Sequence, residues 1–323
     1  MRVDRSYEAG VVLNDGRVLV VGGQGDAIRT VASAELYDPA KGRWANAGRM
    51  HTARRGHTAL MLADGRVLVI GGWNLADRAG PPLFGELFDP ATRMWRKTAA
   101  SMRWRYHPLA VLLRDGRVLV AGGYTENLVN SRTADLYDPV SDTWQKARPM
   151  RAFPTTATML SNGRVLVTHS DAASEVYDPE IGHWSTAPGL SKPSRWSAAT
   201  LLTDGHVLAF WFDRAGKVHA GLYDPVTGRL TATRIPKTGD GPLTRLDDGT
   251  VLVAGRDAFA RYDPTLDRWI KLPLPPLPKD YALPGGGAGG RGGVWADLVI
   301  SLLDGRAIVT EGGSTAIYDP AGN

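Results

Sequence analysis

The sequence predicts an all-β protein built from seven copies of one four-stranded unit. An Asp-Gly or Asn-Gly dipeptide, followed by an apolar run of the Arg-Val-Leu-Val type, recurs every 42–56 residues. Its first residue is Asp15, Asp64, Asp115, Asn162, Asp204, Asp248 and Asp304. A second anchor, Tyr-Asp-Pro or Phe-Asp-Pro, recurs with its aromatic residue at Tyr37, Phe88, Tyr137, Tyr177, Tyr223, Tyr262 and Tyr318. No segment has a sustained helical period, which indicates strands rather than helices. The architecture then follows from the internal repetition.

Each unit is interpreted as four short strands in order. The first is apolar, as in Thr58 to Leu62, and Asp-Gly then supplies the positive φ angles of a tight hairpin turn. The second strand is the Arg-Val-Leu-Val run, closed by Gly-Gly in the first three units. The third ends at Asp-Pro because proline cannot donate to a strand ladder. The fourth carries a tryptophan seven residues after the aromatic anchor, at Trp44, Trp95, Trp144, Trp184 and Trp269, with Leu230 in the fifth unit.

Gly-Gly, Tyr-Asp-Pro and tryptophan at this spacing resemble the kelch repeat, a four-stranded blade of a β-propeller. The resemblance covers the chain and implies a seven-bladed β-propeller of four-stranded blades in one domain, residues 1–323. The approximate blades are 1–49, 50–101, 102–149, 150–187, 188–235, 236–272 and 273–323. Because no tryptophan follows Tyr318, the sequence leaves open whether the last blade has three strands.

An incomplete last blade would leave the edge at residues 314–318 unpaired. Exposed strand edges pair readily with other chains, so we expect a dimer through this edge or marginal stability. Pairing of residues 1–5 with the same edge would instead complete the blade.

Composition limits the classes of function. With 43% hydrophobic and 22% charged residues the chain is globular. The absence of cysteine excludes disulfides, thiolate chemistry and zinc–cysteine sites. No apolar stretch reaches the roughly 18 residues of a membrane helix, and no secretory leader pattern opens the sequence, so we expect no membrane partner and a cytoplasmic protein, or a secreted or surface-attached one if the chain is a fragment.

The net charge of +5 comes from scattered basic residues, without a nucleic-acid-binding motif. We therefore expect no nucleic-acid partner. Scattered arginines favour an anionic small molecule or an acidic peptide as ligand.

The two faces of the fold differ in their functional content. In a four-stranded meander the 1–2 and 3–4 turns lie on one face, here called the turn face. The 2–3 loops and the connections between blades lie on the other, here called the loop face. Turn-face residues are nearly the same in every unit, whereas loop-face residues differ, and loops on a rigid scaffold commonly carry binding residues. We expect the site on the loop face.

Tryptophans and arginines gather at that face. The tryptophans outside the repeat position, which either pack the loops or form a stacking surface, are Trp73, Trp104, Trp196, Trp211 and Trp295. Arginines about ten residues before a unit's Asp-Gly anchor are Arg5, Arg54, Arg105, Arg151 and Arg195. The family places the first strand innermost, so these arginines would ring the mouth of the central channel. They would either clamp an anion or pair with loop-face carboxylates such as Asp26, Asp77, Glu126 and Asp171.

Tyr106-His107 departs from its neighbours in the chain, because His107 lies eight residues before its anchor whereas His57 lies seven before its own. The pair resembles the segment of galactose oxidase and glyoxal oxidase that supplies two copper ligands. Those enzymes also need a tyrosine cross-linked to a cysteine. Tyr7 has a similar position, but this chain has no cysteine.

The remaining metal candidates are few. His169 is the other loop-face histidine that could bind a metal, and catalytic metals normally take three protein ligands. We therefore predict no metal and no cofactor.

The sequence favours a ligand-binding propeller whose site is an arginine- and tryptophan-rich mouth. The ligand would be an anionic small molecule, a saccharide or an acidic peptide. The candidate binding residues are Arg54, Arg105, Tyr106, His107, Arg151, Arg195, Trp196, Trp73, Trp295 and Tyr7. The alternative is a metal-independent isomerase, cyclase or lyase with Tyr106 and His107 as catalytic candidates, in line with kelch-type sialic acid epimerases. The glycine-rich run 285–293 is interpreted as a loop that could cover such a site.

Overall fold

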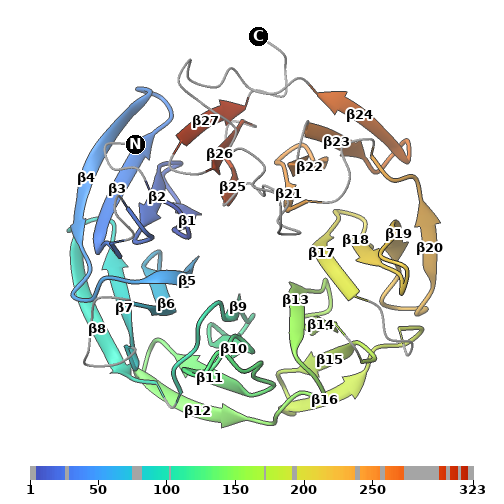
Figure 1. Ribbon diagram of the computed structural model, residues 1–323, viewed down its shortest axis with the longest axis horizontal. Helices are drawn as coiled ribbons and strands as arrows, with labels where there is room; N and C mark the ends of the chain where they lie inside the picture. Colours follow the sequence, from blue (N-terminus) through green and yellow to red (C-terminus); the bar gives the residue numbers. More distant parts are fainter. Residues whose placement is uncertain are drawn as a thin grey trace.

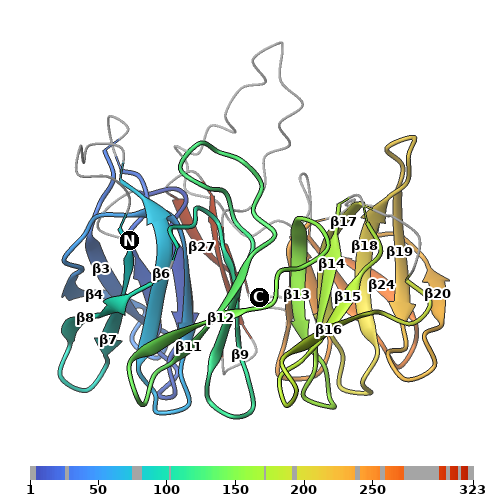
Figure 2. The same cartoon turned by 90° about the horizontal axis from the view of Figure 1, so that it is seen from below.

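The sheets of the protein stand around a common axis, as the computed structural model shows (Figure 1). The structure describes residues 5–25, 29–74, 82–101, 103–170, 172–190, 195–236, 241–254, 259–272, 298–302, 306–311 and 314–318. Within these ranges no helix is long and apolar enough to cross a membrane. Loops between second and third strands rise on one side of the ring, and short turns lie on the other (Figure 2).

Each repeat contributes its strands in the expected order, from the axis outward. The first strands are β1 (Ala9–Val12), β5 (Arg55–Met61), β9 (Leu109–Leu112), β13 (Pro154–Met159), β17 (Arg195–Leu201), β21 (Leu243–Arg245) and β25 (Leu298–Ser301). The second strands are β2 (Val18–Val21), β6 (Val67–Trp73), β10 (Val118–Ala121), β14 (Val165–His169), β18 (Val207–Phe212), β22 (Val251–Ala254) and β26 (Ala307–Glu311). The third strands are β3 (Ser33–Asp38), β7 (Phe84–Asp89), β11 (Ala134–Asp138), β15 (Glu175–Asp178), β19 (Val218–Tyr223), β23 (Phe259–Asp263) and β27 (Ser314–Tyr318). The outer strands are β4 (Arg43–Arg49), β8 (Met94–Ala100), β12 (Thr143–Ala147), β16 (His183–Thr186), β20 (Leu230–Thr233) and β24 (Arg268–Leu272).

The expected count of seven four-stranded blades is wrong. In the described part of the chain the propeller has six four-stranded blades, and the last repeat forms a sheet of three strands, β25–β27. Its third strand, β27, is the outermost described strand of that sheet. A fourth strand needs a further segment after the Tyr-Asp-Pro anchor, and no described residue lies there.

The three-stranded sheet nevertheless closes the ring. First strands contact one another in sequence around the axis, and β25 contacts both β21 and β1. On the blade 1 side, Ile300, Leu302 and Ile308 share a hydrophobic cluster with Val18 and Val20. On the turn face, the Arg306 guanidinium donates to the Pro39 carbonyl at 3.0 Å. Side-chain packing and this hydrogen bond therefore join the last repeat to the first.

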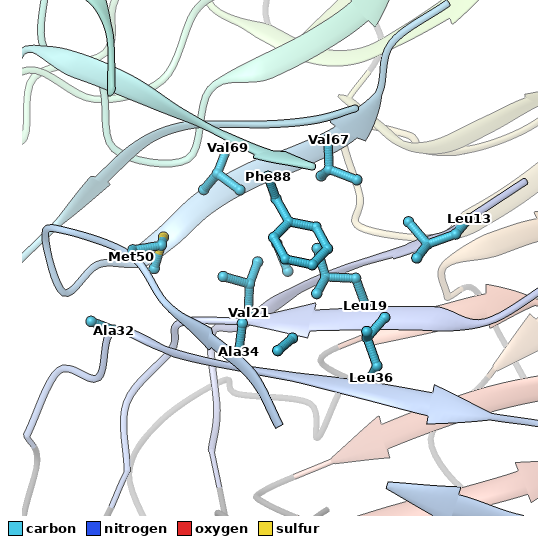
Figure 3. Packing of buried hydrophobic residues seen from close by; sticks show 12 residues of the cluster. Leu13, Leu19, Val21, Ala32, Ala34, Leu36, Met50, Val67, Val69 and Phe88 are labelled. Carbon is cyan, nitrogen blue, oxygen red and sulfur yellow. The ribbon is translucent and has the colours of Figure 1, made fainter. Parts of the chain in front are cut away.

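Hydrophobic cores lie between neighbouring blades. Between blades 1 and 2, the buried Phe88 ring lies among Leu19, Val21, Val67 and Val69, which come from the second strands of both sheets (Figure 3). The second strands are buried on both faces and therefore read as continuous apolar runs. Each blade is consequently stabilised mainly by its two neighbours.

A buried arginine fixes the entrance of the first strand in blades 1–3. The Arg54 side chain is 0% exposed; it donates to the Gly71 and Phe84 carbonyls and forms an ion pair with Glu86 on β7, at 3.1 Å. The equivalent ion pairs join Arg5 to Glu35 at 2.9 Å and Arg105 to Asp135 at 2.6 Å. Burial lowers the pKa of each of these three arginines, and the neighbouring carboxylate partly offsets that effect. In each of these blades the carboxylate belongs to the third strand, where it directly precedes the Leu-Tyr or Leu-Phe pair.

The same arginines also join adjacent blades. Gly23 N–H donates to the Arg54 carbonyl, and Gly72 N–H donates to the Arg105 carbonyl, both at 2.9 Å. A β-carbon on Gly22, next to this contact, would lie 2.6 Å from the Arg54 carbonyl oxygen. Gly-Gly is therefore needed because the next blade's backbone approaches too closely for a side chain.

Blade 4 satisfies its third-strand carboxylate differently. Pro154 stands where blade 2 has Arg54, four residues after a methionine in both blades, so no arginine is available there. His169 instead lies fully buried at the first Gly-Gly position and pairs with Glu175 at 2.9 Å. Arg151 contributes its backbone N–H to the same carboxylate at 2.8 Å. This pairing accounts for His169 as a structural residue.

Blade 5 replaces the ion pair with aromatic packing. Gly221 occupies the carboxylate position, and a β-carbon there would lie 3.0 Å from the end of the Trp211 ring. Trp211 stands at the Gly-Gly position and packs against Trp196 with ring centroids 5.5 Å apart. Blade 5 therefore has neither the third-strand carboxylate nor the arginine that pairs with it in blades 1–3.

Replacing Arg54 by alanine should destabilise the fold by about 3–5 kcal/mol, because the buried Glu86 would lose its arginine and keep only its hydrogen bonds with His51 and Thr52. Arg17→Ala is the matched control, since Arg17 forms a partly exposed turn-face pair with Asp15 that should contribute about 0–1 kcal/mol. Urea unfolding of both variants measures the difference. Equal losses would contradict the structural role of Arg54.

Glu175→Gln should flatten the pH dependence of stability. Burial acts to raise the pKa of Glu175, but the hydrogen bonds with His169 and the Arg151 N–H, with their charges, outweigh it and lower the pKa. A carboxyl whose pKa is lower in the folded state contributes stability above its unfolded pKa, and this contribution is lost as the pH falls through the folded value. Thermal unfolding from pH 7 to pH 3 should therefore decline less steeply for Glu175→Gln than for the parent. Parallel profiles would refute this assignment.

Candidate functional site

Backbone hydrogen bonds join three equivalent positions at the loop-face ends of the innermost strands. Gly56 N–H donates to the Tyr7 carbonyl at 3.0 Å, and His107 N–H donates to the Gly56 carbonyl at 2.7 Å. All three residues have positive φ, 55° for Tyr7, 59° for Gly56 and 52° for His107. This conformation is ordinary for glycine but costs about 1–3 kcal/mol for other residues. Blades 1 and 3 therefore keep a tyrosine and a histidine where glycine would be less strained.

The strained residues belong to a group of side chains that we call the rim cluster, made of Tyr7, Arg55, Tyr106, His107 and Tyr124. Tyr7 and His107 meet edge to face with centroids 6.3 Å apart, and Tyr106 lies 4.2 Å from the His107 ring. Tyr124 lies 6.5 Å from Tyr106. Blades 1, 2 and 3 all contribute to this cluster.

Gly56 makes room for the centre of the cluster. A β-carbon at Gly56 would lie 2.2 Å from a ring atom of Tyr106, so any side chain there would displace the ring. Tyr106 thus lies over the Gly56 backbone of the neighbouring blade. The positive φ and this close approach both require glycine.

Arg55 is the cation of the rim cluster. Its guanidinium lies 5.6 Å from the centroid of the Tyr7 ring and donates to the Gln24 side-chain oxygen. Among the described residues it forms no ion pair, and its buried Nε has no hydrogen-bond partner. The Nε of Arg54 likewise has no partner, but Arg54 forms an ion pair with Glu86, so Arg55 differs from its neighbour in having no carboxylate among the described residues.

The cluster holds a neutral imidazole and a protonated phenol at neutral pH. Burial lowers the pKa of His107, and the Arg55 charge lowers it further, although part of the residue's surface is exposed. Burial also raises the pKa of Tyr106; nearby Tyr7 and Tyr124 add to that rise, while Arg55 opposes it. His107 can therefore accept a hydrogen bond or a proton, and Tyr106 can donate one.

Apolar groups extend the surface beyond the rim cluster. Trp73 meets Tyr106 edge to face at 6.1 Å and Trp104 at 5.4 Å, while Trp104 donates its indole N–H to the Gly72 carbonyl. Past Tyr124, a tight turn exposes Leu128 and Val129, which are 56% and 60% exposed.

The expected ring of free arginines is not what the structure places at the rim. Arg54 and Arg105 are buried in blade interiors, and their partners are third-strand carboxylates rather than Glu126, which lies on an exposed loop. Arg151 is exposed and donates to the Thr186 hydroxyl, because it corresponds to His51 rather than to Arg54. Arg195 lies over the Phe212 ring at 5.5 Å, in blade 5.

The other expected site residues fall into three groups. Tyr7, Tyr106 and His107 come together, with Trp73 beside them. Trp196 is 4% exposed and packs in blade 5, away from this cluster. Trp295, the carboxylates Asp26, Asp77 and Asp171, and the run 285–293 lie outside the described residues.

Two members of the cluster were not predicted from the sequence. Arg55 follows Arg54, and the doubled arginine is the available signal, since Ser6 and Tyr106 take this position in blades 1 and 3. Tyr124 follows Gly-Gly, where blades 1 and 2 have Gln24 and Trp73. Residues of these two positions face each other across the sheet, as in Tyr106 with Tyr124 and Arg55 with Trp73.

The donors at the rim do not fit the copper centre of the oxidases that Tyr106-His107 resembles. The chain contains no cysteine to cross-link Tyr7. Within the described residues, no group of three or more His, Asp or Glu side chains could hold a metal ion, and His169 is already bound to Glu175.

Known proteins share both the repeat and the architecture. The kelch motif family model matches residues 5–51 and 105–151. An F-box/kelch-repeat protein of Arabidopsis thaliana is 35% identical over 118 residues, covering 33% of this chain and 30% of that protein. Kelch-like protein 34 of Homo sapiens is 32% identical over 137 residues, covering 42% and 20%. The matches thus span less than a third of these two relatives.

Solved structures agree in fold at low sequence identity. A fungal alcohol oxidase of the AA5 family, in complex with copper, superimposes with a TM-score of 0.72 at 15% identity, covering 98% of this chain and 74% of that one. A streptogramin B lyase gives 0.70 at 10% identity, covering 99% and 95%. Motif matches, kelch-repeat relatives and sheet topology together identify this chain as a β-propeller that contains kelch repeats.

Proposed function

We propose that this propeller binds an acidic peptide segment of a partner protein at the rim cluster. The observation that carries the proposal is Arg55, a partly buried cation with no carboxylate partner among the described residues and an unpaired Nε donor. A ligand carboxylate would accept two parallel hydrogen bonds from such a guanidinium. The neighbouring arginines 54 and 105 already have carboxylates of their own and cannot compete for it.

The surroundings of Arg55 favour a peptide over a small anion. Tyr7, whose ring lies under the Arg55 guanidinium, is 46% exposed. The exposed residues Leu128 and Val129 follow Tyr124 in the neighbouring loop. Large aromatic side chains with apolar neighbours are typical contact residues of protein interfaces. The kelch-repeat relatives support protein interaction in general, and the net charge of +5 would attract an acidic partner.

Selection from a displayed library of random peptides tests this function. The enriched peptides should contain Asp or Glu next to aromatic or aliphatic residues. Arg55→Ala should weaken their binding by about 1.5–3 kcal/mol, the usual contribution of a hydrogen bond to a charged group. Arg17→Ala, on the turn face, should leave the affinity unchanged. Enrichment without acidic residues, or equal binding by Arg55→Ala, would refute the proposal.

The affinity for such a peptide should rise as the pH falls from 7 to 5. His107 is neutral at pH 7 because its pKa is lowered, and a bound carboxylate would favour its protonated form. Protonation at the lower pH then adds a positive charge beside the ligand. In His107→Gln the affinity should stay constant over this range, as measured by titration calorimetry. A pH-dependent gain that persists in His107→Gln would exclude His107 as its source.

A metal-independent enzyme is the second candidate. The observation in its favour is the contact of a neutral His107 with a protonated Tyr106, the two protonation states that a general base and a general acid require. The streptogramin B lyase supports this candidate only by its fold. Native mass spectrometry of the purified chain distinguishes the two, because a co-purifying small molecule lost in Tyr106→Phe would favour the enzyme.

A further inference from the structure

Side chains at the position after the buried arginine reach toward the preceding blade. Tyr106 of blade 3 lies over the Gly56 backbone of blade 2, where a β-carbon would be 2.2 Å from its ring. Arg55 of blade 2 extends in the same direction, and its guanidinium lies over the Tyr7 ring of blade 1 at 5.6 Å. Residues at this position therefore meet groups that the neighbouring blade supplies.

Gln24 is the blade 1 residue that accepts a hydrogen bond from Arg55. Arg55 Nη1 donates to Gln24 Oε1. The backbone of Gln24 is held by two hydrogen bonds with Ser6, from Gln24 N–H to the Ser6 carbonyl at 2.7 Å and from Ser6 N–H to the Gln24 carbonyl at 2.9 Å. A guanidinium only donates, so the amide oxygen is the group that faces it. Gln24 thus holds Arg55 from a fixed point of the strand ladder.

An amide at this contact leaves the charge of the arginine uncompensated. Arg54 meets the Glu86 carboxylate at 3.1 Å, and Arg105 meets the Asp135 carboxylate at 2.6 Å. An amide oxygen accepts the same kind of hydrogen bond but carries no net charge. In the described part of the chain Arg55 makes no further side-chain hydrogen bond, so its Nη2 and Nε hydrogens remain for a ligand. The guanidinium is therefore oriented without being neutralised.

We infer that Gln24 determines the charge specificity of the rim cluster, an inference that rests on the acidic-peptide function proposed above. Gln24 orients the guanidinium, and because its side chain is neutral, the site prefers Asp or Glu to Asn or Gln in the bound peptide. A carboxylate at residue 24 would pair with Arg55 as Glu86 pairs with Arg54. Such a carboxylate, being part of the chain, would compete with the ligand at an effective concentration on the order of millimolar or higher.

Two synthetic probes test the inference on the full 323-residue chain, acetyl-Phe-Asp-Glu-Leu-amide and its uncharged counterpart acetyl-Phe-Asn-Gln-Leu-amide. The parent should bind the acidic probe about tenfold more tightly than the uncharged one. Gln24→Glu should abolish this preference. Gln24→Ala keeps the charge of Arg55 and should retain the preference, at about threefold lower affinity.

Gln145→Glu is the matched control for the added negative charge. Gln145 is exposed on the outer strand β12, away from the rim cluster, so this variant should bind both probes as the parent does. The urea midpoint of Gln24→Glu should equal or exceed that of the parent, because the substitution adds an ion pair. Lost binding in this variant is then separate from lost folding.

NMR signals of the Arg55 guanidinium measure the pairing without any peptide. Exchange of its Nη hydrogens with water should be slower in Gln24→Glu than in the parent, because a carboxylate binds a guanidinium more strongly than an amide does. In Gln24→Ala the exchange should be faster, because the acceptor is lost.

Three results would overturn the inference. These are an unchanged charge preference in Gln24→Glu, an equal loss of preference in Gln24→Ala, or Arg55 hydrogen exchange that responds to neither substitution. A parent chain that binds neither probe would refute the acidic-peptide function, and the Arg55 exchange would then decide the role of Gln24 by itself. Failure of the site and failure of this assignment are therefore distinguishable.

Discussion

An arginine buried against a carboxylate is the interaction on which the loop face of blades 1–3 depends. The guanidinium of Arg54 binds two carbonyls and Glu86 within its own blade, while its backbone carbonyl accepts a hydrogen bond from Gly23 of the blade before. A buried charge is stable only when an opposite charge and hydrogen bonds compensate it in this way. The strand entrance that follows is therefore held in place, and Tyr7, Gly56 and His107 occupy matching positions two residues further along.

That constraint explains why the rim cluster forms on these three blades. The fixed entrances place equivalent residues within hydrogen-bond distance of one another, so side chains at Tyr7, Tyr106 and His107 converge without a shared loop. Blade 4 pairs its carboxylate with His169, and blade 5 fills the same space with Trp211. The space beside the third strand is thus filled in three ways, by an arginine–carboxylate pair, by His169 with Glu175, or by Trp211. In blade 2 the arginine is Arg54, and the next residue, Arg55, faces the rim.

Closure of the ring is governed by the contacts between neighbouring blades rather than by sheet pairing alone. The last sheet is held to blade 1 by apolar packing and by Arg306 with the Pro39 carbonyl. The same contact recurs where Arg66 and Arg117 reach the Pro139 and Pro179 carbonyls.

The sequence by itself determined the repeat, the order of the strands and the turn and loop faces. These follow from local rules, since Asp-Gly and Asp-Pro specify turns and apolar runs specify buried strands. Its family resemblance correctly implied the kelch propeller, but the count of seven four-stranded blades was wrong. A blade has a fourth strand only where a segment pairs with its third strand, and no described segment pairs with the outer side of β27. Only the tertiary structure decided which arginines are free. Arg54 and Arg55 are adjacent and chemically identical, yet the first faces Glu86, 32 residues away in sequence, while the second faces the rim. Pairing over such distances depends on the packing of whole blades, which sequence spacing does not encode.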